Sequence, residues 1–350
     1  EVILITGSLE PTSTKLNPKI KIILKCKYKR NKGYLRIFTW LLFYIQSFIY
    51  ILFEKYHGKI LFVSNPPLLP FLGSNFYGSK NIDFDVLIYD VYPDALSNFG
   101  YIKEGSYLYR FWDRMNKKVY KKAQRIFTIS EVMKKFVARN VESSKIKVVY
   151  PWVDTSFIKP MRKKDNSFVE KIGLSDKKVI LYSGNMGLTH DLKIVLKTAK
   201  KMNASKNNFH FLFIGDGAQK KNLLRYKEDN NLSNVTFLPY QDPEVLPFSF
   251  GSADFAIVSL SSVAEGLSVP SKTFYSLAAG SAIIAISEKG SEIEQLISKN
   301  DCGISIQPNE VSIMRDFLTN TSDLDLEQKK KNSRILSNQF TVANVKYFLK

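Results

Sequence analysis

Short apolar runs alternate with amphipathic helical patterns along most of the chain, and this predicts an α/β fold. In the first half, strands are expected at residues 59–64, 84–89, 125–129 and 147–150, with helices at 107–122 and 131–140. Ser130 stands where the N-cap of the second of these helices is expected. Strands that alternate with helices in this way are typical of a parallel sheet.

The second half repeats the alternation. It follows a polar stretch at residues 154–178, which we interpret as an interdomain linker. Strands are expected at residues 179–183, 210–214, 235–238, 255–259 and 282–286, with a further edge strand at 303–306. Two doubly wound halves joined by one linker are expected to bind a ligand in the cleft between them.

One apolar run, at residues 37–53, is long enough to need its own interpretation. It has about 17 residues, fewer than the ~20 of a usual membrane span, and contains Gln46 and Ser47. Three readings are open: a helix packed in a soluble domain, an interfacial helix that dips into lipid, and a true span. The basic run at residues 25–32 supports the interfacial interpretation, because lysines beside an apolar helix are attracted to anionic lipid.

Composition narrows the choice of partner and compartment. The 350 residues suggest two domains, and 51 Lys+Arg against 32 Asp+Glu give a formal net charge of +19. Such an excess favours nucleic acid, an acidic membrane face or phosphorylated substrates. Only Cys26 and Cys302 occur, so a reducing compartment is expected and a structural zinc site is not. The chain has no initiator Met and no signal peptide, and we expect it to begin inside a domain.

Three polar signals follow strands of the second half. They are the turns Gly184 to Gly187 and Gly215 to Gly217, and the segment from Glu265 to Lys272. In an open parallel sheet, strand ends meet at one edge, where glycines let backbone approach a diphosphate. Pro270 and Ser271 precede a small-residue helix whose N-terminus suits a phosphate, although an ordinary capped helix gives the same pattern.

The order of these motifs resembles retaining glycosyltransferases of family 4. The matching text is LYSGNMGLTHDL, FLFIGDGAQKKNL, NVTFLPY, ADFAIVSL, EGLSVPSKTFYSLAAG and ISKNDCGISI, with YDVYPDAL, TISEVMKKFV and VVYPWVD in the first half. It is similar to the bacterial surface-polysaccharide enzymes that carry a PSK motif. The resemblance implies the GT-B fold, in which two Rossmann-like, doubly wound parallel-sheet domains face a cleft. The implied boundaries are 1–155 for the acceptor-side domain, 156–335 for the nucleotide-sugar domain, and 336–350 for a helix that packs back on the first domain.

Site roles follow from the resemblance, residue by residue. Catalytic roles are implied for Glu265, which would hold the donor sugar, for Lys272, which would neutralise the diphosphate, and for Asp90. Donor-binding roles are implied for Gly184, Asn185, Met186, Gly187, His190, Gly215, Asp216, Gly217, Leu238, Pro239, Tyr240, Pro270, Ser271 and Tyr275. Asp94 and Tyr92 lie on the implied acceptor side. The two aspartates either orient the acceptor or cap a loop.

The chain departs from the family pattern at three positions. Tyr275 stands in place of the second glutamate of the family's pair, and Asn185 and His190 stand where many members have arginine and lysine. The loop that follows the family's first strand has no counterpart, because residues 1–6 resemble the second strand. The acceptor site is therefore expected to be incomplete.

The implied activity is retaining transfer of a sugar from a nucleotide sugar, most simply a UDP-sugar, to a lipid-linked or glycan acceptor. The implied setting is capsule, O-antigen or exopolysaccharide synthesis at the cytoplasmic face of the plasma membrane, with no cofactor, no metal and no nucleic acid. The triplet Asp83-Phe84-Asp85 resembles a metal-binding DxD motif but leads into a strand. Two alternatives remain: a UDP-sugar epimerase of the same fold, and a basic nucleic-acid-binding protein.

Overall fold

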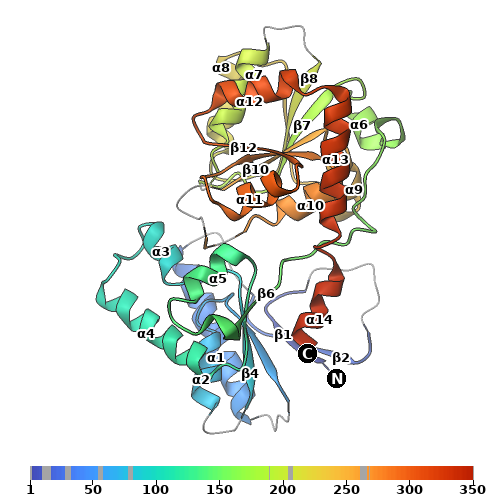
Figure 1. Ribbon diagram of the computed structural model, residues 1–350. Helices are drawn as coiled ribbons and strands as arrows, with labels where there is room; N and C mark the ends of the chain where they lie inside the picture. Colours follow the sequence, from blue (N-terminus) through green and yellow to red (C-terminus); the bar gives the residue numbers. More distant parts are fainter. Residues whose placement is uncertain are drawn as a thin grey trace. The chain divides into compact units, whose positions relative to one another are not determined.

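The computed structural model describes residues 2–9, 17–27, 33–53, 58–77, 82–188, 190–203, 208–260, 266–267 and 269–349. The chain forms two compact units (Figure 1). The first comprises residues 1–128 and 137–147, and the second comprises residues 129–136 and 148–350. Each unit is built on a parallel sheet, as the alternating pattern predicts.

The first unit has a four-stranded sheet in the order β3-β4-β5-β6. Its strands are β3 (Ile60–Val63), β4 (Phe84–Ile88), β5 (Ile126–Thr128) and β6 (Ile146–Val148). Its helices are α1 (Gly33–Phe53), α2 (Pro70–Phe76), α3 (Asp94–Asn98) and α4 (Tyr107–Lys122), while α5 (Glu131–Val137) falls mostly in the second unit. Every residue of β4 is buried, which explains its almost continuous apolar run.

A separate pair of parallel strands lies ahead of this sheet. β1 (Val2–Thr6) pairs with β2 (Ile20–Leu24) in register from Val2 opposite Ile20 to Thr6 opposite Leu24. The strand expected at the start of the chain is therefore present, and in the described part of the chain its sheet partner is β2.

The DxD-like triplet is explained by the first sheet. Asp85 lies inside β4, and its Oδ2 is 2.6 Å from Nη2 of Arg125 and 3.1 Å from Nζ of Lys59. These ion pairs compensate the buried charge of Asp85, so its carboxylate is engaged within the first unit.

The second unit has a six-stranded parallel sheet in the order β12-β11-β10-β7-β8-β9. The strands are β7 (Lys178–Ser183), β8 (Phe209–Ile214), β9 (Val235–Leu238), β10 (Phe255–Ser259), β11 (Ala282–Ile286) and β12 (Gly303–Ile306). The edge position predicted for residues 303–306 is confirmed.

Two apolar cores cover the two faces of this sheet. Because side chains alternate along a strand, Val179 and Leu181 of β7 enter one core, and Ile180 and Tyr182 enter the other. The first core receives side chains from α6 (Ser167–Lys171), α9 (Leu246–Gly251), α10 (Lys272–Ala278), α11 (Glu292–Lys299) and α13 (Asp323–Ser337). The second receives them from α7 (Lys193–Asn203), α8 (Lys220–Asp229) and α12 (Val311–Asn320), and also Leu326 from the first turn of α13 (Figure 1).

The polar stretch expected to be a linker is instead part of the second unit. Ile158, Phe168, Val169 and Leu174 are buried in its first core, so four apolar side chains tie the segment down despite its polar composition. Residues 129–136 also belong to the second unit, and the last passage of the chain between the units is at 147/148, ahead of the expected boundary at 155.

The last residues also group with the second unit. Phe340 is fully buried and packs its ring on Phe274, and Phe348 of α14 (Lys346–Leu349) contacts the ring of Trp152. The segment 336–350 was expected to pack on the first domain, whereas these contacts are all made within the second unit.

Candidate donor-binding site

The turns after β7 and β8 lie against each other. The N–H of Gly184 donates to the carbonyl of Ile214 at 2.9 Å, and the N–H of Met186 donates to the carbonyl of Asp216 at 2.6 Å. The next turn follows on, because the N–H of Gly215 donates to the carbonyl of Leu238 at 3.0 Å. The structure thus brings together the first two of the three strand-end signals that the sequence placed at one sheet edge.

Glycine is required where these turns meet. Gly184 and Gly215 both have φ of +134°, and a Cβ added to Gly215 would lie 2.1 Å from the carbonyl oxygen of Gly184. A Cβ on Gly217 would lie 2.6 Å from the carbonyl oxygen of Met186. Backbone packed this closely leaves no room for a side chain at Gly215 or Gly217.

Lys272, the first residue of α10, reaches the first of these turns. Its Nζ donates to the hydroxyl of Tyr182 at 2.6 Å and lies 3.9 Å from the centroid of that ring. A Cβ built on Gly184 would be 3.6 Å from the same Nζ. Burial lowers the pKa of Lys272 to about 7, and in the described part of the chain no carboxylate pairs with it.

Tyr182 links the lysine to the turn. Its hydroxyl accepts from Lys272 and donates to the carbonyl of Asn185 at 2.6 Å. Burial raises its pKa, and nearby Tyr240 raises it further. Sequence reasoning missed Tyr182; the available signal was a polar hydroxyl in an apolar strand, one residue before its end.

His190 is held beside the lysine. Its Nδ1 donates to the carbonyl of Ser259 at 2.7 Å, which sets the Nδ1–H tautomer and leaves Nε2 as an acceptor. Burial first, and then the charge of Lys272, lower the pKa of His190 to about 4. Ser259, which the sequence reading did not select, also accepts from the N–H of Asp191 through its hydroxyl at 2.9 Å.

The remaining predicted donor residues divide into exposed and packed positions. Pro239 and Tyr240 are exposed after β9, and Ser271 is exposed just before α10, which begins at Lys272. Tyr275 is half-buried and stacks on Phe250, with ring centroids 5.4 Å apart, so its ring is part of the core. Glu265 lies outside the described residues.

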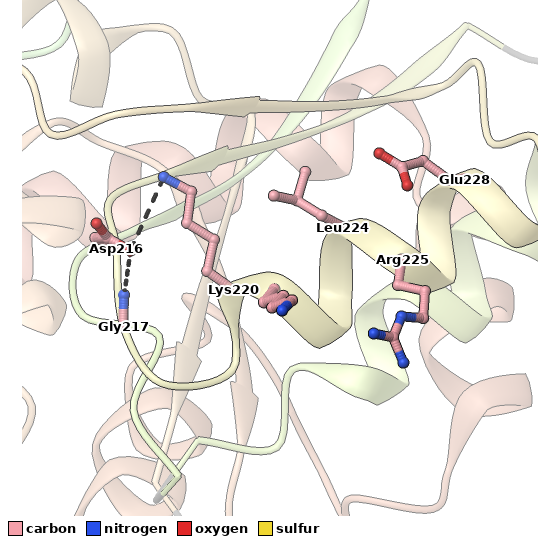
Figure 2. A pocket seen from close by; sticks show the side chains of 7 residues that line it. Asp216, Gly217, Lys220, Leu224, Arg225 and Glu228 are labelled. Atoms are coloured by element: carbon pink, nitrogen blue, oxygen red, sulfur yellow. Dashed lines mark hydrogen bonds and ion pairs between the residues drawn. The ribbon is translucent and has the colours of Figure 1, made fainter.

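A hollow of about 460 Å³ lies beside the second turn (Figure 2). Its lining comes from Asp216, Gly217, Lys220, Lys221, Leu224, Arg225 and Glu228, on the turn and the outer side of α8. Figure 2 shows Lys220 extended back toward Asp216, with its Nζ 4.0 Å from Oδ1 of that residue. The same Nζ donates to the carbonyl of Gly215 at 3.0 Å. Asp216 is held by the N–H of Gly217 at 2.8 Å. The hollow thus has three basic and two acidic side chains in its lining and adjoins the second glycine turn.

The predicted acceptor-side residues belong to the first unit. Asp90 follows β4, and burial raises its pKa; its carboxylate has no hydrogen bond or ion pair with the residues that the structure describes. Asp94 differs because its Oδ1 accepts from the hydroxyl of Tyr109 at 3.0 Å. Tyr92 stacks on Trp112 with centroids 5.8 Å apart, which fixes its ring.

Sequence reasoning also missed Ser64, which follows β3. Its Oγ accepts from the N–H of Tyr89 at 2.9 Å and from the N–H of Asp90 at 3.4 Å. This hydroxyl therefore binds the backbone just after β4 and fixes the position of Asp90 at the start of the following loop. Over the described ranges, no cluster of three or more His, Cys, Asp or Glu side chains is arranged for a metal ion.

Comparison with known proteins gives the class of the second unit. Residues 164–332 match the family model described as Glycosyl transferases group 1, so this unit carries a domain of that group. The chain is 26% identical over 268 residues to the "Probable glycosyltransferase WbjE" of Pseudomonas aeruginosa, covering 76% of this chain and 66% of that protein. The match thus spans slightly less than two thirds of this relative.

Solved structures give the fold of the whole chain. Anabaena Alr3699/HepE in complex with UDP-glucose superposes with a TM-score of 0.70 at 13% identity, covering 94% of this chain and 84% of that one. WaaG, a glycosyltransferase involved in lipopolysaccharide biosynthesis, gives a TM-score of 0.67 at 14% identity, covering 96% and 86%. The chain therefore has the α/β architecture with parallel sheets of the GT-B glycosyltransferases, as the sequence motifs predict.

Proposed function

We propose that this protein is a retaining glycosyltransferase of the family 4 type, which transfers a sugar from a UDP-sugar to a lipid-linked or glycan acceptor. The observation that carries the proposal is Lys272. A half-buried amine without a carboxylate partner in the described structure lies beside the glycine turn that follows β7. A half-buried cation placed this way lacks a counter-ion, and a diphosphate supplies one.

Each group near the amine has a role in this reaction. Lys272 would bind the diphosphate and stabilise the negative charge that grows on it as the bond from the anomeric carbon to the phosphate oxygen breaks. Tyr182 holds the amine toward the turn. Neutral His190 would accept a hydrogen bond at Nε2 from a hydroxyl of the donor sugar. The acceptor oxygen forms the new bond on the face that the phosphate leaves, and the leaving phosphate takes the acceptor's proton.

Donor and setting are proposed from relatives and charge. HepE is described in complex with UDP-glucose, and WaaG as involved in lipopolysaccharide biosynthesis. A hexosyl donor and a role in surface-polysaccharide synthesis fit these names. An N-acetylhexosaminyl donor and action at the cytoplasmic membrane face are proposed from the sequence resemblance alone. The net charge of +19 suits both an anionic donor and a phosphorylated acceptor.

The test is nucleotide binding, measured as thermal stabilisation and by calorimetry with UDP, GDP, ADP and CMP. Stabilisation by UDP is expected, and Lys272→Ala should weaken binding ~10- to 100-fold, because a charge-assisted contact is worth about 1.5–3 kcal/mol. Lys197→Ala removes an exposed lysine of α7 and should leave affinity unchanged. Binding and transfer should persist in EDTA. Equal affinity for UDP in wild type and Lys272→Ala would refute the assignment.

A further inference from the structure

Helix α1 exposes its large apolar side chains, which is the reverse of an ordinary surface helix. Seven large apolar side chains are 40–79% exposed: Ile37, Phe38, Leu41, Ile45, Ile49, Leu52 and Phe53. At 100° per residue they share one side of the helix, and no polar residue is exposed among them. We call this set the α1 apolar face.

The opposite side of α1 carries the helix's small polar residues and packs on the protein. Thr39, Phe43, Ser47 and Ile51 are buried and recur every four residues. The hydroxyl of Thr39 donates to the carbonyl of Leu35 at 2.9 Å, so the helix itself satisfies it. These contacts fix which side of α1 is turned outward.

Helix α7 provides the comparison within the same chain. Its exposed positions are Lys193, Lys197, Lys200 and Lys201, and its buried positions are largely apolar. A helix in water normally has this arrangement, because exposed apolar area is unfavourable. The α1 apolar face thus has the composition of a surface that is covered.

The charge around α1 indicates what covers it. Residues 11–53 contain nine Lys or Arg and no Asp or Glu. Lys19, Lys21 and Lys27 on and beside β2 are exposed, and none forms an ion pair with a carboxylate in the described ranges. The side chain of Lys25 lies against α1, with its Nζ 5.4 Å from the ring centroid of Tyr50.

We propose that the α1 apolar face docks the protein onto an anionic lipid bilayer, with the helix parallel to the membrane surface. Apolar side chains would enter the boundary between headgroups and acyl chains, and the neighbouring lysines would meet anionic headgroups. A second copy of the chain is a poorer occupant, since it would bring two basic regions together.

The length of α1 would also suit a membrane span, because residues Leu35–Phe53 have a mean hydropathy of 1.6. Spanning would require Phe43 and Ile51 to leave the first unit and face lipid. A parallel orientation keeps those contacts and uses only the side already exposed. The inference goes beyond the proposed activity, because vesicle binding requires neither donor nor transfer.

The experiment is flotation of the full chain with vesicles of phosphatidylcholine alone and with ~30% phosphatidylglycerol. Wild type should float with the anionic vesicles. The triple variant Phe38→Gln, Ile45→Gln, Ile49→Gln should lose at least tenfold in partition, because three apolar contacts with lipid are removed. Lys21→Gln with Lys25→Gln should lose ~5-fold per lysine on anionic vesicles. Lys197→Ala and Lys200→Ala on α7 are the matched controls and should float as wild type.

Three outcomes would overturn the inference. One is a folded, UDP-binding wild type that does not float. Another is a dimer by light scattering that the triple variant converts to monomer, which would make the face a contact between copies. The third concerns orientation: Phe38→Trp near the start of α1 and Ile45→Trp at its middle should be quenched equally by shallow brominated lipids, because a parallel helix holds both at the same depth. Quenching of Ile45→Trp chiefly by deep brominated lipids would indicate a span. Retained UDP affinity in all variants separates failure here from failure of the proposed function.

Discussion

The amine of Lys272 both donates to the hydroxyl of Tyr182, at 2.6 Å, and lies 3.9 Å from the centroid of its ring. A cation held over an aromatic face is stabilised without a counter-ion, though less than by a carboxylate. This explains how the protein keeps a lysine among buried groups while leaving it available to an anion. It also predicts that protonation and donor binding are coupled.

Donor affinity should therefore fall as the pH rises above 7. The pKa of Lys272 is lowered to about 7 in the free protein, and a bound diphosphate raises it again. Below pH 7 the amine is already charged, so affinity is flat. Above pH 7 the free protein must take up a proton to bind, and affinity falls by up to about tenfold per pH unit. Calorimetry with UDP-glucose from about pH 6 to pH 8.5 measures this.

Arginine provides the matched control, because its side chain stays charged throughout this range. Lys272→Arg should bind UDP-glucose no more tightly than wild type does at pH 6. Its affinity should not change between pH 6 and pH 8.5. If Lys272→Arg shows the same decline as wild type, another group causes it.

Removing the charge of Lys272 should stabilise the fold. Its pKa is about 7 folded and 10.5 unfolded, so below pH 7 both states are protonated and the folded state bears the full cost of burying charge. Between pH 7 and 10.5 the unfolded chain binds more protons, and this cost disappears as the pH rises. Lys272→Met should raise stability at pH 6 by on the order of 2–5 kcal/mol, with little gain at pH 10. Urea unfolding at both pH values, with Lys197→Met as control, tests this.

His190 should remain neutral through the physiological range. Burial and the charge of Lys272 lower its pKa to about 4, while its Nδ1 donates to Ser259. A ¹⁵N NMR titration should show the Nδ1–H tautomer and no change between pH 5 and pH 8. The chain has three histidines, so His190→Gln assigns the signal. A midpoint near the usual 6.5 would contradict the described geometry.

Gly215 should be far less tolerant of alanine than an unconstrained glycine. Both Gly215 and Gly290 have positive φ, but a Cβ on Gly215 would meet the carbonyl of Gly184 at 2.1 Å, whereas Gly290 has nothing within 4 Å. Gly290→Ala should cost about 1 kcal/mol from backbone strain alone. Gly215→Ala should cost at least about 2 kcal/mol more and weaken UDP binding, because the turn must shift. Equal melting temperatures would show that the turns are not packed as described.

Much of this architecture was readable from the sequence, for a physical reason. Residues 235–238, 255–259 and 282–286 are strands with the predicted bounds. Those at 255–259 and 282–286 are buried throughout, and strands buried on both faces read as continuous apolar runs. The convergence of Gly184, Gly215 and Lys272 was also predictable, since parallel strands end at a common edge.

Tertiary contacts account for what the pattern did not give. Residues 154–178 look like a linker by composition, yet Ile158 and Phe168 are buried in the core of the second unit. The role of Tyr182 was missed because its side chain lies within an apolar strand, and the hydrogen bond from Lys272 is seen only in the packed structure. Such pairings depend on how strands and helices pack, which periodicity does not specify.

Substitutions of Asp90 and Asp94 should differ in their effect on turnover. Asp90 has a carboxylate without a partner in the described structure and a pKa raised by burial, whereas Asp94 already accepts from Tyr109 at 3.0 Å. If Asp90 orients the acceptor, Asp90→Asn should lower turnover at least ~10-fold with UDP affinity unchanged, since a positioned carboxylate acts on the acceptor and not on the nucleotide. Asp94→Asn keeps an acceptor oxygen for Tyr109 and should change turnover less than about threefold. Transfer rates and melting temperatures of both variants test this. Equal losses of turnover, accompanied by equal losses of melting temperature, would indicate that both residues only cap their loop.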